Sequence, residues 1–196
     1  MNKILLLMAL TLSTNIYSQS SDNDPGIIFS VAGVLSDSVK GIEDDEDKLN
    51  YGAGALVEFS LNDHFGLETG ALLIKRQYSF KVSELEATQT VSRLHVPMMA
   101  RFWFSDYFSI AGGPFLSWKT GDAQTNVAFG DTDLIDVKTS ANETTQFGLE
   151  TAATLNFAIN DKTGLFVEGR YSSLLGKENN EESQQISAFT GIKFNL

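Results

Sequence analysis

The chain has 196 residues, no cysteine, and 25 acidic against 14 basic residues, which gives a formal net charge of -11. The lack of cysteine excludes disulfides and thiolate metal sites. The acidic balance argues against nucleic-acid binding, because a basic footprint for phosphates is missing.

The first 20 residues predict a secretory signal peptide. Lys3 precedes an apolar run from Ile4 to Leu12, and small and polar residues follow around Ser18. The run is too short for a membrane-spanning helix, which needs about 20 residues, and its order is typical of a signal peptide. We therefore expect a signal peptide over residues 1–20 and one domain over residues 21–196.

From Gly26 to Leu196 the chain falls into eight segments in which apolar and polar residues alternate. The pattern is clearest in residues 49–61, 147–159 and 186–196. A period of two is typical of β-strands, and each segment covers the roughly 9 to 11 residues that a tilted strand needs to cross a bilayer. The parity of the first segment stays open, because it is apolar on both faces.

The connectors between these segments alternate between short and long. The short ones are residues 62–65, 105–106 and 160–163. The long ones are residues 36–48, 81–90, 120–142 and 176–184. Bacterial outer-membrane barrels have short periplasmic turns, longer external loops and an even number of strands. The sequence therefore predicts an all-β fold, an eight-stranded antiparallel up-and-down transmembrane β-barrel in the cell outer membrane.

Alternation alone does not say which face points outward, since a soluble lipocalin-like carrier would place the apolar face inside. The other face carries charges of both signs, as expected inside a narrow lumen. An eight-stranded barrel is only wide enough for its interior side chains to fill it, and unpaired buried charge is costly. We therefore predict an ion-pair network that plugs the lumen, made of Glu58, Glu68, Arg76, His95, Arg101, Glu150, Glu168, Arg170 and Lys193.

Aromatic residues gather near the short connectors, where they predict a girdle at the periplasmic interface. The members, near the short turns or the C-terminus, are Phe59, Phe65, Phe102, Phe104, Tyr107, Phe108, Phe157 and Phe194.

The long connectors hold most of the negative charge. Two clusters offer carboxylates for loop cation contacts, namely Glu43, Asp44, Asp45, Glu46 and Asp47, and then Asp131, Asp133 and Asp136. Neither has the spacing of an EF-hand, so a solvated, self-repelling loop is the simpler interpretation. Divalent cations on such loops could bridge the protein to lipopolysaccharide. We expect no dedicated metal site and no cofactor.

Catalysis has little support in the sequence. A lipid-modifying enzyme would need a serine, a histidine and a carboxylate, and His95 could reach Ser79, Ser83 or Ser117 only across strands. A histidine tied into the lumen network is the preferred interpretation. We expect no enzymatic activity.

Four short motifs carry a family resemblance. They are LHVPM at residues 94–98, AGGPF at 111–115, VEGRYS at 167–172 and GIKF at 191–194. In this order they resemble the strands of the PorT-like outer-membrane β-barrel family, which is common in Bacteroidetes. The resemblance implies an integral outer-membrane barrel, whose molecular role is undefined in most members. Pro97 predicts a local bulge, because proline removes a donor from a paired strand.

We expect a structural or binding role at the cell surface, with residues 120–142 as the first candidate for partner contact. The expected partners are outer-membrane lipid and lipopolysaccharide, the barrel-assembly machinery during insertion, and an envelope protein at the external loops. A lipid-modifying enzyme, a narrow pore for small solutes and a soluble periplasmic carrier are the alternatives.

Overall fold

A computed structural model describes residues 26–38, 50–82, 85–121, 123–129, 132–139, 145–175 and 184–196. For residues 38, 77–82, 85–89, 123–124, 126–129 and 132–139 it describes the backbone alone. The predicted signal peptide, the acidic residues 43–47 and Asp131 lie outside the described residues.

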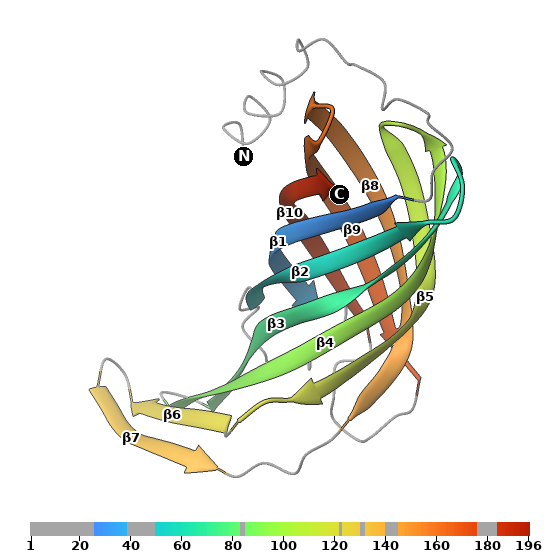
Figure 1. The fold of residues 1–196 in the computed structure, drawn as a ribbon. Coiled ribbons are helices and arrows are strands. Elements are labelled where there is room, and N and C mark those ends of the chain that lie inside the picture. Colours follow the sequence, from blue (N-terminus) through green and yellow to red (C-terminus); the bar gives the residue numbers. More distant parts are fainter. Residues whose placement is uncertain are drawn as a thin grey trace.

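The described residues form ten strands. They are β1 (Ile27–Ser38), β2 (Asn50–Ser60), β3 (Phe65–Val82), β4 (Leu85–Ser105), β5 (Phe108–Lys119), β6 (Ala123–Phe129), β7 (Thr132–Thr139), β8 (Gln146–Asn160), β9 (Thr163–Leu174) and β10 (Gln184–Asn195). All except β6 and β7 close into an antiparallel barrel, because β1 pairs with β2 on one side and with β10 on the other. The predicted eight-stranded up-and-down barrel is confirmed (Figure 1).

Two of the predicted long loops are largely strand. β3 and β4 run through most of residues 81–90, and β6 and β7 form a hairpin within residues 120–142. β6 pairs with β4 at the point where β5 has ended, with Thr90 opposite Gln124. Continued pairing satisfies backbone groups that a loop would leave to solvent. A sheet of β3, β4, β6 and β7 therefore projects from the barrel at the end opposite the C-terminus (Figure 1).

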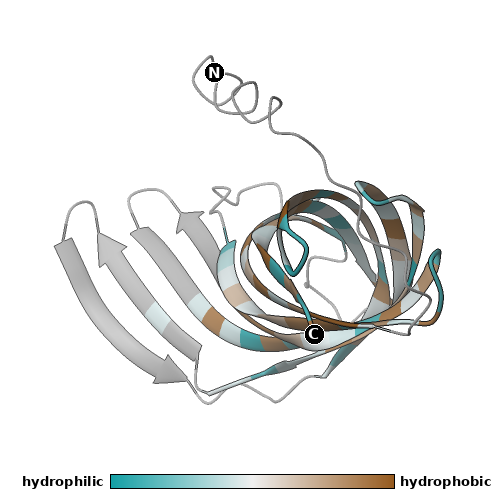
Figure 2. Cartoon of the chain, turned by 45° about the horizontal axis from the view of Figure 1, so that its top comes forward, coloured by the Kyte–Doolittle hydropathy of each residue, from teal (hydrophilic) through white to brown (hydrophobic). Residues whose placement is uncertain are grey.

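The two faces of the barrel wall differ as the alternation predicts. Along β8, Phe147, Leu149 and Leu155 are about half exposed, whereas Glu150 and Thr154 are buried. Figure 2 shows the same alternation of hydrophobic and hydrophilic residues around the ring of strands. The apolar face points outward, so the soluble carrier, which needs that face inside, is wrong.

The first strand, whose parity the sequence left open, has a defined inner face. Ile28, Ala32 and Val34 are buried in the lumen, while Val31 and Leu35 are exposed on the outer surface. Apolar residues occur on both faces of β1 because its inner face packs against the apolar part of the barrel interior.

Pro97 causes no bulge, so this expectation is wrong. The pairs Val96 with Leu116 and Ala100 with Gly112 lie in one continuous register between β4 and β5. The ladder between β3 and β4 is interrupted at Pro97, which has no backbone N–H to donate. The register shift in β4 lies instead between Trp103 and Ser105, beside the turn to β5.

The short turns are held by side-chain oxygens. Asn62 Oδ1 accepts from the backbone N–H groups of His64 and Phe65, both at 2.9 Å. Asn160 Oδ1 accepts from the backbone N–H of Lys162 at 3.0 Å. Asparagine favours tight turns because its side chain replaces a backbone acceptor.

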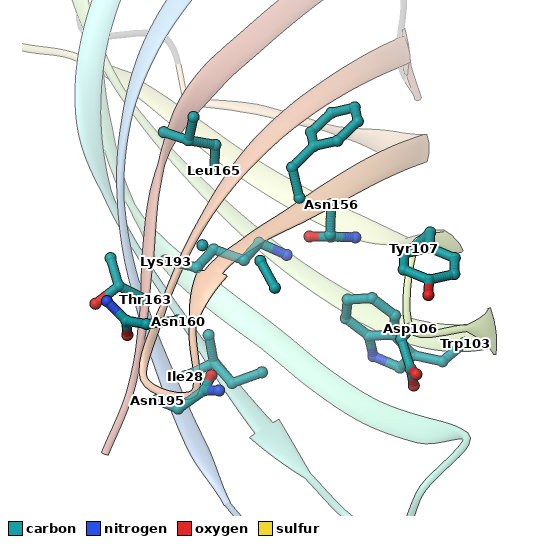
Figure 3. A pocket seen from close by; sticks show the side chains of 13 residues that line it. Ile28, Trp103, Asp106, Tyr107, Asn156, Asn160, Thr163, Leu165, Lys193 and Asn195 are labelled. Carbon is teal, nitrogen blue, oxygen red and sulfur yellow. The ribbon is translucent and has the colours of Figure 1, made fainter. Parts of the chain in front are cut away.

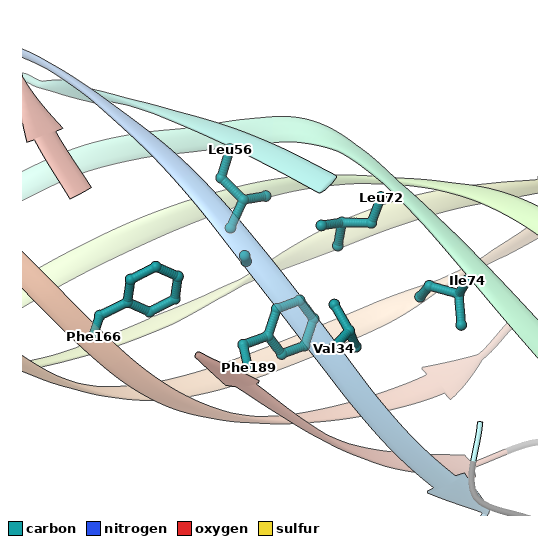
Figure 4. Close-up of a cluster of buried hydrophobic side chains, with 7 residues drawn as sticks. Val34, Leu56, Leu72, Ile74, Phe166 and Phe189 are labelled. Atoms are coloured by element: carbon teal, nitrogen blue, oxygen red, sulfur yellow. The ribbon is translucent and has the colours of Figure 1, made fainter. Parts of the chain in front are cut away.

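One side of the barrel interior is apolar. The apolar cluster consists of Ala32, Val34, Leu56, Leu72, Ile74, Phe166 and Phe189, from β1, β2, β3, β9 and β10 (Figure 4). Gly191 makes room for it, because a Cβ at that position would lie 1.9 Å from the carbonyl oxygen of Val31 and 2.9 Å from the Phe166 ring. Charged side chains fill much of the remaining interior.

Candidate functional site inside the barrel

Arg101 on β4 is the centre of the charged interior and is 1% exposed. Its guanidinium donates to Glu68 on β3 and, at 2.7 Å, to Glu168 on β9. Arg101 Nε lies 3.4 Å from Glu58 Oε2 on β2. The same guanidinium donates to two hydroxyls, Ser109 on β5 and Thr154 on β8. One side chain therefore joins β4 to five other strands.

Arg170 on β9 is the second cation of the network. It donates to Glu68 Oε1 at 2.7 Å and to Glu168, and its Nη1 lies 3.8 Å from Glu150 Oε2. Its guanidinium also stacks over the Phe189 ring, with 4.3 Å between the guanidinium carbon and the ring centroid. Arg170 thus joins the charged residues to the apolar cluster.

His95 on β4 extends the network toward the external end. Its Nε2 lies 3.1 Å from Glu150 Oε2, and Ser172 donates to Glu150 Oε1 at 3.2 Å. The imidazole packs against Phe115 with 4.7 Å between ring centroids. We refer to Glu58, Glu68, His95, Arg101, Glu150, Glu168 and Arg170 as the ion-pair network.

Two predicted members lie outside this network. Arg76 donates to the side-chain amides of Gln185 at 2.7 Å and Gln146 at 3.5 Å. Lys193 Nζ lies 5.1 Å from the ring centroids of both Trp103 and Phe166. Neither cation forms an ion pair with a carboxylate among the described residues, so their placement differs from the prediction.

Sequence reasoning missed two interior side chains that have the right parity. Arg93 is buried and donates to Ser117 Oγ at 3.2 Å and to the Ser117 carbonyl at 3.4 Å. Trp103 donates its indole N–H to Glu58 Oε1 at 2.7 Å. Both lie an even number of residues from Arg101, so the alternation of faces along β4 predicts that they point into the lumen.

The arrangement of the charged side chains closes the lumen of the barrel. Arg101 and Arg170 share Glu68 and Glu168, so each cation is paired with several carboxylates in a space that excludes water. Buried charges persist only when they are paired and hydrogen-bonded in this way. Such an arrangement crosses the lumen and leaves its charged groups engaged with one another.

Among the described side chains, His95 makes no hydrogen bond to a serine. Ser117 lies directly opposite His95 in the register, but its Oγ accepts from Arg93. The side chain of Ser79 and all of Ser83 lie outside the described residues.

The described ranges hold no cluster of cation ligands. They contain no group of three or more His, Asp or Glu side chains that could hold a metal ion. Asp133 and Asp136 lie on the backbone of β7, and the other predicted cation contacts are outside what the structure describes. No helix in these ranges is long and apolar enough to cross a membrane.

Aromatic rings line the rim beside the short turns. Phe65 contacts Phe102 at 4.9 Å between centroids, Phe102 contacts Phe104 at 4.8 Å, and Phe104 contacts Phe108 at 5.6 Å. The row crosses β3, β4 and β5 on the outer surface, where an aromatic girdle meets the membrane interface.

An antiparallel eight-stranded barrel with an apolar outer face and a charged interior defines a small integral outer-membrane protein. The chain belongs to the outer membrane protein beta-barrel domain family, whose model matches residues 6–178. It is therefore a transmembrane protein of the bacterial cell envelope, located in the outer membrane.

The solved structures that the chain resembles are distant from it in sequence. Acinetobacter baumannii CarO is 13% identical, with 88% of this chain and 98% of CarO covered and a TM-score of 0.50. Yersinia pestis Ail, in complex with the heparin analogue sucrose octasulfate, is 11% identical, with 90% and 100% covered and a TM-score of 0.49. Neisserial surface protein A is 15% identical, with 87% and 96% covered and a TM-score of 0.46. No curated protein matches the chain.

Proposed function

We propose that the protein is a non-conducting outer-membrane barrel with a structural or binding role at the cell surface. The observation that carries this proposal is the position of Arg101, which contacts side chains from five other strands across the lumen. A solute path would have to separate these pairs, and breaking a buried pair leaves an uncompensated charge. The interior is therefore a plug.

The external sheet is the proposed contact surface. β3 and β4 extend beyond the point where β5 ends, and the β6–β7 hairpin widens the sheet. β7 pairs only with β6 among the described strands, so it presents a free edge. Edge strands are surfaces on which other chains can pair. We propose an envelope protein as the partner of residues 120–142, with lipopolysaccharide around the barrel and the barrel-assembly machinery as the insertion partner.

The motifs at residues 94–98 and 167–172 support a finer assignment to the PorT-like group. That assignment agrees with an integral outer-membrane barrel and specifies no partner.

Conductance of the refolded chain in planar bilayers tests the plug. We expect no stable open level for the native chain, because the ion-pair network fills the lumen. The variant Arg101→Ala should show transient openings, because it removes the side chain that contacts all three of Glu58, Glu68 and Glu168. Lys75→Met is the matched control, since Lys75 is an exposed cation on the outer face of β3. A stable, large conductance of the native chain would overturn the proposal in favour of a narrow pore.

Replacement of residues 123–139 by a short Gly-Ser turn tests the contact surface. The barrel strands are unaffected by this change, so heat-modifiable migration on a semi-native gel should persist. Photo-crosslinks to envelope proteins from a probe on β4 should be lost in intact cells. An unchanged crosslink pattern would contradict a role for the hairpin.

We propose no catalytic role for His95, because its Nε2 is engaged by Glu150 and Ser117 is engaged by Arg93. His95→Ala should leave the lipid A mass profile of the cells unchanged. Loss of a lipid A species in that variant would favour the lipid-modifying enzyme.

A further inference from the structure

A pocket opens at the periplasmic end of the barrel, next to the ion-pair network and far from the external sheet. Its volume is about 50 Å³, and it lies between the β4–β5 turn, the β8–β9 turn and the end of β10 (Figure 3). Its polar lining includes Lys193, Asn156 and Asp106, and its aromatic lining includes Trp103 and Tyr107.

The polar groups facing this pocket lack partners. Lys193 Nζ and both amide atoms of Asn156 are buried and make no hydrogen bond within the described part of the protein. Figure 3 shows the Lys193 ammonium directed toward the Asn156 amide and the Trp103 ring. Buried polar atoms are normally paired, so each such group calls for an explanation.

Neighbouring carboxylates do not supply the missing acceptor for Lys193. Glu58 Oε1 accepts from Trp103, and Glu58 Oε2 lies 3.4 Å from Arg101 Nε without a hydrogen bond. Glu168 is held by Arg101 and Arg170. Neither carboxylate forms an ion pair with Lys193 among the described residues. A bound cation is disfavoured, because Lys193 already places a positive charge at this position. The free groups are instead a cationic donor, an amide donor and an amide acceptor.

We propose that this pocket binds the carboxylate group of a small organic acid that enters from the periplasm. One carboxylate oxygen accepts from Lys193 Nζ and the other accepts from Asn156 Nδ2. Charge-assisted bonds of this kind are among the stronger hydrogen bonds. A water occupies about 10–15 Å³ in such a space, so the cavity has room for a group of acetate size. The apolar carbons lie against Trp103, and longer acids extend outward past Asp106 and Tyr107.

Acetate is the probe, and Trp103 is the reporter. The chain has two tryptophans, and Trp118 lies at the far end of β5 on the outer face, so Trp118→Phe leaves Trp103 as the only indole. The full chain, refolded in detergent micelles, is titrated with sodium acetate at constant ionic strength maintained with sodium chloride. We expect a saturable change in Trp103 emission with acetate and none with chloride alone.

Matched variants locate the binding groups. Lys193→Met keeps the length of the side chain and should raise the half-saturation concentration about tenfold or more, as expected for the loss of one charged hydrogen bond. Asn156→Leu should raise it by a smaller factor. Lys162→Met, an exposed lysine in the neighbouring turn that does not line the pocket, should leave it unchanged.

Saturation-transfer NMR on the native chain provides a second measurement that needs no variant to fold. Transfer from the protein to the acetate methyl group should be present and should be displaced by propionate. The absence of a saturable acetate response, an equal response to chloride, or an unchanged response in folded Lys193→Met would each overturn the proposal.

Discussion

The barrel interior has two halves that fill the same narrow space by different means. On the side of β1 and β2, the apolar cluster packs Leu56 and Leu72 against Phe166 and Phe189. The ion-pair network around Arg101 fills the part of the interior that faces β4, β5 and β8, and it shares β2, β3 and β9 with the apolar cluster. The free energy of unfolding falls gradually with the volume removed from an apolar cluster. Removing one partner of a buried ion pair costs more at once, because it leaves an uncompensated charge. The apolar cluster should therefore tolerate substitutions that conserve side-chain volume, whereas the ion-pair network should tolerate the loss of none of its charged members.

The largest expected effect is in the charged half. Arg101→Met leaves Glu58, Glu68 and Glu168 without their shared cation, and it should lower the free energy of unfolding by about 3–5 kcal/mol. Reversible urea unfolding of the refolded chain in lipid vesicles measures this. Arg101→Lys should recover little of the loss, because an ammonium cannot reproduce the planar fork of donors. A loss below about 1 kcal/mol would contradict the claim that the ion-pair network needs all of its charged members.

The apolar half should respond by size. Leu72 is 0% exposed, and Leu72→Ala should lower the free energy of unfolding by about 2–4 kcal/mol, within the range for buried leucines. Leu72→Met nearly conserves volume and should cost less than about 1.5 kcal/mol. The same urea transitions apply. If Leu72→Met were as damaging as Leu72→Ala, the distinction between the two halves would fail.

The boundary between the halves is the contact of Arg170 with Phe189. Phe189→Leu keeps an apolar side chain but removes the ring beneath the guanidinium. We expect a loss of about 1 kcal/mol, partly from packing and partly from the cation–π contact. A double-mutant cycle with Arg170→Met would measure the coupling between the two side chains. Strict additivity would mean that the halves are energetically independent.

A smaller effect than that of Leu72→Ala should lie outside both halves. Leu155 is 50% exposed on the lipid-facing surface, so Leu155→Ala exchanges contact with lipid rather than with the interior. We expect a loss of less than about 2 kcal/mol in vesicles, because Leu155→Ala loses transfer of apolar area from water into lipid but creates no packed cavity inside the barrel. An effect as large as that of Leu72→Ala would show that this position packs against something other than lipid.

Strand alternation predicted the barrel and most of the network, since a period of two assigns each residue to a face. It placed Glu58, Arg101 and Glu168 in the lumen but gave no information on which charges meet. Arg76 therefore pairs with amides, and Lys193 lies over aromatic rings. These partners depend on register across strands that are distant in the sequence, which alternation does not encode.

The external sheet was missed for a related reason. Residues 81–90 and 120–142 are polar and acidic, which is typical of solvated loops, but pairing beyond the membrane needs only compatible backbone geometry. β4 continues because β6 takes the place of β5 beside it. The apolar cluster was also not foreseen as a unit, because Leu56 and Phe189 are isolated among small and polar neighbours along their own strands.

Arg101 has a consequence for how the barrel is made. Its partners come from β2, β3, β5, β8 and β9, so they span nearly the whole chain and meet only when the ring has closed. A partly inserted sheet would carry these charges unpaired toward the hydrocarbon. The pairing of Arg101 therefore ties the early strands β2 and β3 to the late strands β8 and β9, so the interior charges are matched only after most of the chain has joined the barrel.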